Sequence, residues 1–581
     1  MEHIKPLVGL GEGDGTPGDE DDSIDFIWGA RIPMRDGVHL NATIYKPRTA
    51  QATPAIFSLT PYISDSYHER AYYFACHGYA FALVDSRGRG NSEGDFEPMV
   101  MEGVDGHDVV QWLAGQPWCD GSVAMWGGSY AGLNQWVTLK EQPAALKTIA
   151  PVAAAHAGID FPALGNIFFS YALQWLTFVS GLTPNTNLFG ESSFWMAKFR
   201  HLFLNHLPFS SFDRLIGNTS TCFQTWLAHP AYDDYWAAMV LSAEDYDRIE
   251  VPILTITGHY DGDQPGAMHY YRQHMASSSP SRDRHYLIIG PWNHAGTRTP
   301  AAEFGGLKLG EASLLDLNEL HLAWYDWILK EGEKPEFLKK RVAYYVMGAE
   351  EWKYANSLAG ISDETRRLYL NSANGRANDL FHSGVLQGSP PGQSEPDHYI
   401  YDPLDVRPAE LETEEIEEYL TDQRYALNLF GAGLVYHSDP FAEETEVSGN
   451  VRLVTWLALD VPDTDFWVTL YEIQADGRSI QLTDTLLRAR YRNSLSQEEL
   501  LTPGEINRFE FDGFTFFSRR IAKHSRLRLV IRAPNSIHVQ KNYNSGGQVA
   551  EESAADARTA HVTLYHDEAH PSYLELPIAN D

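Results

Sequence analysis

The chain has 581 residues and a mass of 65.3 kDa, more than one hydrophobic core usually fills, so we expect two to four domains. Hydrophobic residues make up 43% and aromatic residues 12%, a composition that excludes disordered and fibrous proteins. The 44 Lys and Arg against 78 Asp and Glu give a formal net charge of −34, and so acidic a surface makes nucleic acids and anionic membranes poor partners.

The first segment along the chain, residues 1–25, is predicted to be a disordered acidic leader, because it contains little that could be buried. It lacks the apolar core of a secretory signal peptide, and no apolar run in the chain reaches the ~18 residues that a membrane span needs. Cys76, Cys119 and Cys222 are the only cysteines, too few for a disulfide framework and without metal-ligand spacing. These features predict a cytoplasmic protein that has no metal site and does not contact membranes.

The next part of the chain has the pattern of an α/β sheet. Apolar alternation on both sides of a turn at residues 35–37 predicts a hairpin over 27–47. Short apolar runs, typical of fully buried strands, follow at 55–59, 79–85 and 122–128. Residues 103–118, between the last two, have helical spacing, and strand patterns return at 251–258 and 285–290. This alternation predicts a parallel sheet with crossover helices.

Two further regions differ from this pattern. The stretch 163–245 is rich in aromatic residues and poor in strand signals, which predicts helices that cover the ligand-binding edge of the sheet. After residue 335, short runs with polar alternation predict an antiparallel β sandwich or jelly roll, and the acidic run 410–418 is expected to be a solvated loop or helix face. The predicted domains are an α/β domain of residues 26–162 and 246–334, a helical cap of 163–245, and a β domain of 335–581.

The strongest local signal is the sequence WGGSYAG at residues 126–132. It follows a predicted strand and precedes a helix-compatible segment, which is the setting of a nucleophile elbow. Ser129 would then occupy a strained turn, where small neighbours relieve crowding and backbone N–H groups at the helix N-terminus can bind a developing oxyanion. Ala131 stands where the strict G-x-S-x-G pattern has its last Gly, so a glycine-rich turn with an incidental serine is the alternative.

A serine nucleophile needs a base, and the base needs an orienting acid. In α/β-hydrolases the acid and then the histidine follow the nucleophile along the chain, each just past a strand. Asp261 follows the strand at 251–258, and His294 follows the strand at 285–290. Other acids and histidines in the same loops compete with them: His259, Asp263, Asp283 and His285. Chain order, strand ends and the elbow together favour a serine hydrolase.

These segments resemble the cocaine esterase and α-amino-acid ester hydrolase family, which is similar to the X-Pro dipeptidyl-peptidases. The resemblance runs from about residue 30 to beyond 350, and Gly127 to Gly132 satisfy the family elbow G-x-S-Y-x-G. The motifs that carry it are MRDGVHLNATIYKP, DSRGRGNSEGDF, QPWCDGSVAMWGGSYAG, TGHYDGD, IGPWNHAG, WYDWILKEGEKP and VMGAEEWKYA. The resemblance implies an α/β-hydrolase fold with an inserted helical cap and a C-terminal β jelly-roll domain.

The resemblance also implies roles for individual residues. It assigns Ser129, Asp261 and His294 as the catalytic triad. It further implies that a tyrosine hydroxyl in a loop after an early strand binds the oxyanion, together with a backbone N–H. In this sequence these groups are the hydroxyl of Tyr62 and the N–H of Tyr130.

The substrate-binding residues are where this sequence departs from one branch of the family. α-Amino-acid ester hydrolases resemble one another in holding the substrate ammonium with three carboxylates. Two of the corresponding positions here are Asp263 and Gln264, so one carboxylate is missing, and Asp160 is the candidate for the third. The alternative for Asp263 is a solvated loop acid or a helix N-cap.

Other conspicuous residues have ordinary alternatives. Trp175 and other cap aromatics (Phe178, Trp195 and Phe199) are candidates for an acyl or aryl pocket, or are core residues. Arg87 and Arg89 are expected to bridge loops. The five-residue spacing of His201 and His206 does not fit a metal site on a helix.

The sequence therefore predicts a cofactor-free serine hydrolase that cleaves carboxylic esters through an acyl-enzyme on Ser129. α-Amino-acid esters and β-lactam side-chain amides are further candidate substrates, so the expected partner is a small-molecule ester or amide. One alternative is an X-Pro dipeptidyl-peptidase-like exopeptidase, in which Asp263 or Asp160 would hold the peptide N-terminus. Another is a non-catalytic carbohydrate-binding or scaffold protein. A homo-oligomer is compatible with the sequence.

Overall fold

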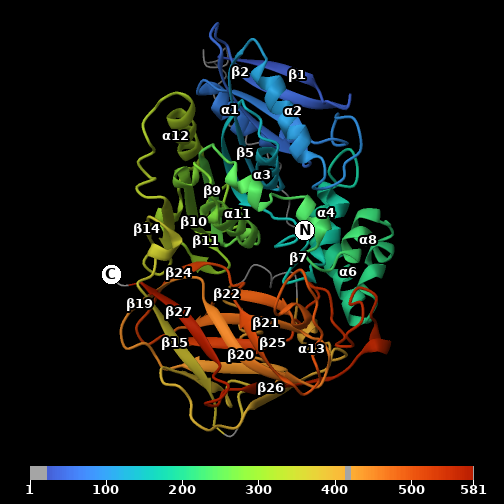
Figure 1. The fold of residues 1–581 in the computed structure, drawn as a ribbon, viewed down its shortest axis with the longest axis vertical. Coiled ribbons are helices and arrows are strands. Elements are labelled where there is room, and N and C mark those ends of the chain that lie inside the picture. Colours follow the sequence, from blue (N-terminus) through green and yellow to red (C-terminus); the bar gives the residue numbers. More distant parts are fainter. Residues whose placement is uncertain (1–22, 374, 413–419, 580–581) are drawn as a thin grey trace, which may run out of the picture.

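A computed structural model describes residues 23–373, 375–412 and 420–579. Figure 1 shows an α/β domain, a group of cap helices at its side and a β-rich domain below both. The predicted leader lies outside the described residues except for its end, and Ile24 already begins the first strand. The predicted acidic run at 410–418 also lies outside the described residues from 413 onward.

The α/β domain is built on a ten-stranded mixed sheet with the order β1-β2-β4-β3-β5-β6-β9-β10-β13-β14. Neighbours from β4 through β13 are parallel, and the outer pairs are antiparallel. The strands are β1 (Ile24–Pro33), β2 (His39–Pro47), β3 (Thr53–Thr60), β4 (Ala80–Asp85), β5 (Cys119–Ser129), β6 (Leu146–Ala154), β9 (Ile253–Tyr260), β10 (His285–Asn293), β13 (Val342–Val346) and β14 (Glu351–Ala355). The inner strands are mostly apolar and buried because both faces of the sheet are covered.

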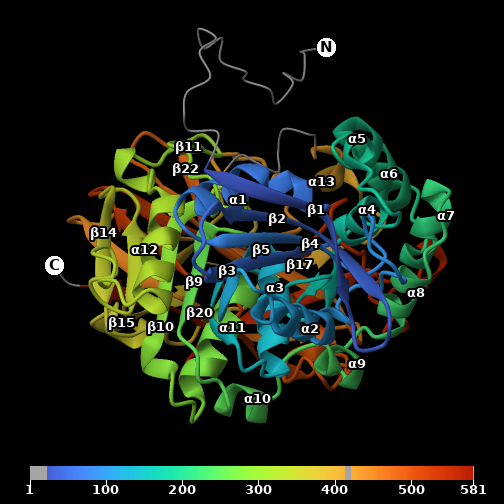
Figure 2. The same ribbon diagram turned by 90° about the horizontal axis from the view of Figure 1, so that it is seen from above.

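Two layers of helices cover the sheet, and Figure 2 shows them on its opposite sides. On one face pack α2 (Glu102–Ala114), α3 (Tyr130–Lys140) and α11 (Gln264–Ala276), where the rings of Trp136 and Tyr270 stack 4.7 Å apart. On the other face pack α1 (His68–Cys76) and α12 (Leu317–Leu329). No helix within the described ranges combines the length and apolar character needed to cross a bilayer.

The sheet extends further along the chain than the sequence indicates. The run 342–348 reads as the first strand of the β domain, but β13 is fully buried and pairs in parallel with β10. β14 then closes the sheet as an antiparallel edge strand. The boundary predicted at residue 334 therefore precedes the last two strands, and we propose that the α/β domain ends after β14.

The cap between β6 and β9 begins with a short hairpin and continues as small helices around an aromatic core. Its elements are β7 (Ala163–Leu164), β8 (Ile167–Phe168), α4 (Tyr171–Phe178), α5 (Thr186–Phe189), α6 (Ser192–Leu204), α7 (Phe212–Ile216), α8 (Thr221–Ala228), α9 (Asp234–Ala238) and α10 (Ala243–Asp247). A region of such high aromatic content buries enough area to pack these short helices, which would be unstable alone.

The described residues of the C-terminal domain form a thirteen-stranded β structure around a large hydrophobic core. All its strand pairs are antiparallel except β16 with β18. The strands are β15 (Glu364–Asn371), β16 (Gly384–Gln387), β17 (Asp397–Tyr401), β18 (Gly433–Ser438), β19 (Thr445–Gly449), β20 (Arg452–Leu459), β21 (Asp465–Ile473), β22 (Ser479–Arg488), β23 (Ile506–Phe511), β24 (Phe517–Ile521), β25 (Arg526–Arg532), β26 (Ala560–Tyr565) and β27 (Tyr573–Ala579), with one short helix, α13 (Arg407–Glu410). The fold is thus the predicted α/β-hydrolase with an inserted cap and a C-terminal β domain.

Candidate active site

The turn between β5 and α3 has the geometry of a nucleophile elbow. Ser129 ends β5 with φ 61° and ψ −125°, a conformation that costs free energy for a residue with a side chain. Its small neighbours are required by close contacts. A Cβ on Gly132, for example, would lie 2.9 Å from the Cα of Ala154 in β6. The sequence therefore places a strained serine at the N-terminus of α3.

The acid and the histidine predicted from strand ends meet at the same edge of the sheet. Asp261 follows β9 and His294 follows the neighbouring strand β10, and His294 Nδ1 lies 2.8 Å from Asp261 Oδ1. Thr257 Oγ1 donates to the other carboxylate oxygen at 2.8 Å, and the N–H of Asp263 donates to Oδ1 at 3.1 Å. A buried carboxylate with these donors fixes the ring orientation of His294 and leaves Nε2 for a proton transfer.

The electrostatics of this pair favour charge separation. Burial alone would raise the pKa of Asp261, but hydrogen bonds from His294 and Thr257 and the charge of His294 hold it below its usual value. Burial alone would lower the pKa of His294, but the charge of Asp263 and the hydrogen bond to Asp261 raise it. A ring held this way accepts a proton readily and is stabilised once it carries one.

The competing histidines and acids lie elsewhere. His259 is buried against the ring of Phe516, and neither of its ring nitrogens has a hydrogen-bond partner among the described residues. His285 is a buried residue that contacts Thr255 and His274 at 2.8 and 2.9 Å. Asp283 pairs with Arg341 at 2.5 Å. These three residues are structural, and only Asp263 remains beside the candidate site.

The hydroxyl of Tyr62, just after β3, is held by the cap. The indole Nε1–H of Trp175 in α4 donates to Tyr62 Oη at 3.0 Å. An indole is only a donor, so the hydroxyl hydrogen of Tyr62 remains available for another acceptor. Burial raises the pKa of Tyr62 well above its usual value, so the hydroxyl keeps its hydrogen. The Ser129 hydroxyl is close enough to oppose part of this rise in pKa.

Trp175 itself is largely buried in the cap. Only 4% of it is exposed, and its ring packs at 5.4 Å on the ring of Tyr130. Trp195 and Phe199 are likewise buried in the cap core. The side chain of Arg89 donates to the carbonyls of Pro61 and Val179 at 2.7 and 2.9 Å, which joins the Tyr62 loop to the end of α4.

Tyr130 presents its backbone and its side chain to different partners. Its hydroxyl points into the core, donates to the buried carboxylate of Glu102, and accepts from the N–H of Met99 at 2.6 Å. Its N–H is in the first turn of α3, where helix donors have no partner within the helix. Burial raises the pKa of Glu102 to about 7. Nothing in the sequence pattern singles out Glu102.

Asp263 is the residue of the predicted ammonium-binding set that reaches the candidate site. Its Oδ2 lies 3.8 Å from His294 Nδ1, and its side chain is 18% exposed. It precedes α11, but its side chain makes no capping hydrogen bond, so the N-cap alternative is excluded. Burial raises its pKa to about 6, with the Asp261 charge adding to this and His294, Arg298 and the Ser129 hydroxyl opposing it.

Asp160 and Gln264 make structural hydrogen bonds instead. Asp160 accepts from the N–H groups of His156 and Gly266 at 2.8 and 2.5 Å, which anchors the first turn of α11. Gln264 donates to the carbonyls of Gly258 and Phe516, both at 2.9 Å, and accepts from the N–H of Phe516 at 2.6 Å. A carboxylate could not make the two donations, so the glutamine joins α11 to the β domain.

Arg298 is a charged residue that the sequence reading does not identify. Its side chain packs on the residue before the nucleophile, because a Cβ on Gly128 would lie 2.5 Å from Arg298 Nη1. This Nη1 is buried and has no hydrogen-bond partner among the described residues. The guanidinium acts electrostatically on both Asp263 and His294.

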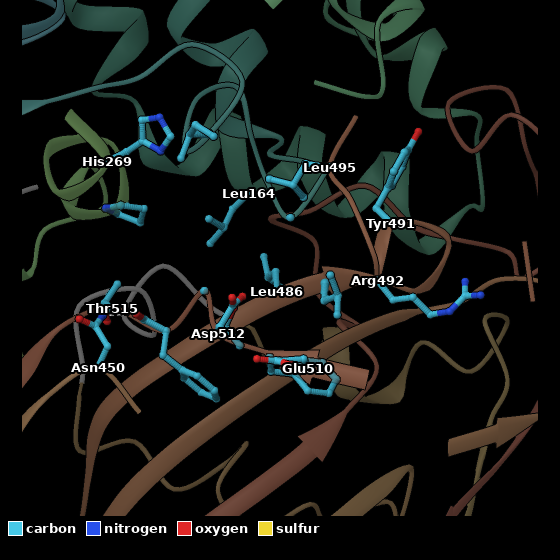
Figure 3. A pocket seen from close by; sticks show the side chains of 18 of the residues that line it. Leu164, His269, Asn450, Leu486, Tyr491, Arg492, Leu495, Glu510, Asp512 and Thr515 are labelled. Atoms are coloured by element: carbon cyan, nitrogen blue, oxygen red, sulfur yellow. Dashed lines mark hydrogen bonds between the residues drawn. The ribbon is translucent and has the colours of Figure 1, made fainter. Parts of the chain in front are cut away.

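A separate cavity of about 580 Å³ lies behind the first turn of α11, between the α/β domain and the β domain. Figure 3 shows His269 and Leu164 on one side and Arg492, Glu510 and Asp512 on the other. Gln264 and Pro265 contribute to its wall, whereas none of the predicted triad residues lines it. The described residues contain no cluster of His, Cys, Asp and Glu that could hold a metal ion.

Comparison with known proteins places this site in context. Residues 36–296 match the X-Pro dipeptidyl-peptidase (S15 family) model, and residues 337–575 match the X-Pro dipeptidyl-peptidase C-terminal non-catalytic domain. A cocaine esterase from Rhodococcus sp. (strain MB1 Bresler) is 28% identical over 575 residues, 94% of this chain and 97% of the relative.

Two solved structures share the whole fold. An aminopeptidase from a marine sediment archaeon of the Thaumarchaeota has a TM-score of 0.83 at 20% identity, covering 99% of each chain. An α-amino acid ester hydrolase has a TM-score of 0.81 at 21% identity, covering 99% of this chain and all of its own. At these identities the two structures establish the common architecture.

Proposed function

We propose that this chain, a member of the cocaine esterase and α-amino-acid ester hydrolase family of serine hydrolases, cleaves carboxylic esters through an acyl-enzyme on Ser129. The observation that carries this proposal is the 2.8 Å contact between Asp261 and His294 at the sheet edge where Ser129 is held at φ 61°. Nucleophile, base and acid thus come from three strand ends.

The reaction follows from the roles that this geometry supports. His294 Nε2 takes the proton of the Ser129 hydroxyl as Oγ attacks the ester carbonyl, and Asp261 stabilises the resulting imidazolium. The hydroxyl of Tyr62 and the N–H of Tyr130 donate to the oxyanion. His294 then gives its proton to the leaving alcohol, and a water molecule repeats the cycle to release the acid.

The experiment that tests the nucleophile is covalent labelling with a fluorophosphonate. We expect the wild type to be labelled at Ser129, and Ser129→Ala to lose both the label and the hydrolysis of 4-nitrophenyl esters. Labelling that persists in Ser129→Ala would refute the assignment, and an unlabelled wild type would favour the scaffold alternative.

The β domain supplies a matched control serine. Ser394 Oγ lies 2.9 Å from His566 Nδ1, and His566 Nε2 lies 2.9 Å from Asp397 Oδ2, but this serine is not at a strand-to-helix elbow. Ser394→Ala should keep full labelling and full activity. Comparing Ser129→Ala with Ser394→Ala separates the effect of the nucleophile elbow from that of a Ser-His-Asp arrangement alone.

The match to the X-Pro dipeptidyl-peptidase family model supports an exopeptidase as the alternative function. Rates on X-Pro anilides and on neutral aryl esters, measured with one enzyme preparation, distinguish the two substrate classes. We expect the esters to have the higher kcat/KM, and a preference for the X-Pro anilides would replace the esterase proposal by the exopeptidase. The proposed partner is a small-molecule ester, and the exopeptidase alternative would take an amide instead.

The cellular compartment and the oligomeric state of the chain can also be tested. We propose a cytoplasmic protein, supported by three cysteines that are all free. Light scattering of the purified chain tests whether it forms the homo-oligomer that the sequence allows.

A further inference from the structure

Two opposite charges flank the candidate nucleophile. The carboxylate of Asp263 lies 3.8 Å from His294 Nδ1 and interacts with the Ser129 hydroxyl. The guanidinium of Arg298 packs on Gly128, directly before Ser129 in the chain. The local charge that an acyl group meets is therefore set by both residues, because each is within electrostatic reach of the reacting atoms.

The guanidinium of Arg298 is not fully hydrogen-bonded within the protein. The Nη1 of Arg298 is buried and unpartnered among the described residues, so a donor stands free beside the elbow. A buried donor without an acceptor costs free energy, and a buried charge is screened only weakly from the groups around it.

Two other residues of the predicted ammonium-binding set differ from Asp263, because the fold already uses their polar atoms. Both carboxylate oxygens of Asp160 accept backbone N–H groups at the start of α11. Gln264 is neutral and joins α11 to the β domain. Asp263 is thus the carboxylate outside the proposed triad that lies beside His294, and the charge of Arg298 acts on it.

Building on the proposed esterase function, we propose that Arg298 is a specificity-determining residue that offsets the charge of Asp263. The site then takes esters of uncharged acyl groups and discriminates against acyl groups that carry a cation. Without Arg298, the carboxylate of Asp263 would attract such a cation.

The test uses two 4-nitrophenyl esters of the same shape. One is the trimethylammonioacetate, which carries a permanent cation, and the other is the 3,3-dimethylbutanoate, which has carbon in place of the nitrogen. The measured quantity is the ratio of kcat/KM for the cationic ester to that for the neutral ester, corrected for uncatalysed hydrolysis. Comparing this ratio between variants cancels the intrinsic reactivity of the esters.

We expect Arg298→Met to raise this ratio roughly tenfold over wild type, since a charge is removed at short range. Asp263→Asn should lower it, and Arg298→Lys should stay near wild type. Arg272→Met removes an equal charge on the far side of α11, where Arg272 donates to Asn450 at 2.8 Å, and should leave the ratio unchanged.

An unchanged or lower ratio in Arg298→Met, in protein that still reacts with fluorophosphonate at Ser129, would overturn the proposal. So would a rise in Asp263→Asn, a variant that answers the same question if Arg298→Met does not fold. Failure of the esterase function has a different signature, because wild type would then hydrolyse neither ester and Ser129 would not be labelled.

Discussion

At the scale of single residues, two neighbouring tyrosines contribute to the oxyanion site in different ways. The hydroxyl of Tyr130 is engaged by Glu102, so this residue can offer only its backbone N–H. Tyr62 accepts a hydrogen bond from Trp175 and keeps its own hydrogen. The cap therefore does more than cover the site, since it orients one of the two proposed oxyanion donors.

Replacing Trp175 by Phe tests this orientation. The substitution keeps an aromatic ring on Tyr130 but removes the donor to Tyr62, so we expect kcat on a neutral aryl ester to fall roughly tenfold, with KM little changed, a smaller loss than the ~10²–10³ for deleting an oxyanion donor. Trp195→Phe is the matched control, because that indole donates to the carbonyl of Leu188 at 2.7 Å, away from the site. Equal losses in both variants would mean that Trp175 acts only through cap packing.

A second residue-scale prediction concerns pH. Only the unprotonated imidazole of His294 can act as a base, so kcat/KM should rise with pH through the pKa of His294. Burial alone would lower that pKa, and the charge of Arg298 also lowers it. The charges of Asp263 and Asp261 outweigh both effects and raise the pKa of His294. Asp263→Asn should therefore move the acidic limb of the profile to lower pH, by roughly one unit.

The profile is measured with the neutral ester, whose charge does not change with pH. Asp283→Asn serves as the control, because Asp283 pairs with Arg341 far from the site and its loss should leave the limb in place. A limb that stays fixed or moves to higher pH in Asp263→Asn would show that Asp263 does not raise the pKa of His294.

At the scale of secondary-structure elements, the start of α11 connects the site to the β domain. Asp261 and Asp263 precede the helix, and its first residue, Gln264, makes hydrogen bonds to both sides of the interface. The β domain therefore supports the loop that holds the proposed acid. This arrangement explains why a carboxylate is absent at residue 264.

Gln264→Glu tests that connection. The variant loses the two hydrogen bonds that Gln264 donates to the carbonyl oxygens of Gly258 and Phe516. It also places a carboxyl group against these oxygens, so we expect the free energy of unfolding to fall by about 2–4 kcal/mol. Gln273→Glu makes the same change at an exposed position of the same helix and should have little effect. Denaturant unfolding followed by fluorescence measures both, and equal midpoints for the two variants would refute the role of Gln264.

Local sequence signals predict single elements but not the contacts between elements. Strands such as β4 and β9 could be predicted because an apolar run is a local signal, and Asp261 and His294 followed from their places at strand ends. The contact between Trp175 and Tyr62 joins residues 113 positions apart, and no periodicity reports such a pair. Arg298 and Glu102 were missed for the same reason, because their partners come from other elements.

At the scale of the whole molecule, cap and β domain are joined by a buried lysine. Lys541 Nζ donates to the carbonyl of Phe203 in α6 at 2.9 Å and lies 2.9 Å from His206 Nδ1. Burial lowers the pKa of Lys541 to about 7, against the opposing charge of Asp402. The amine is therefore largely neutral in the folded protein above neutral pH, whereas in the unfolded chain it stays protonated up to its ordinary pKa.

This difference makes stability depend on pH with a definite sign. Between pH 7 and about 10 the unfolded chain binds a proton at Lys541 that the folded protein does not bind, so this residue makes stability rise with pH, by at most about 1.4 kcal/mol per unit. Below pH 7 both states are protonated and the slope vanishes. Burial and the Lys541 charge lower the pKa of His206, so His206 is neutral in both states above pH 7.5 and adds no slope there.

Lys541→Met should remove this contribution. Other groups titrate in the same range, so the measured quantity is the difference in unfolding free energy between wild type and variant at pH 7.5 and pH 9.5. We expect wild type to gain stability relative to the variant as pH rises. Only wild type has a lysine at this position that must release a proton on folding, and this release becomes easier at higher pH. Lys523→Met, at an exposed turn of the same domain, is the matched control for the loss of a lysine that is not buried between domains. A pH-independent difference for Lys541→Met would mean that the lysine is charged within the interface, and that cap and β domain are joined there by an ammonium group rather than an amine.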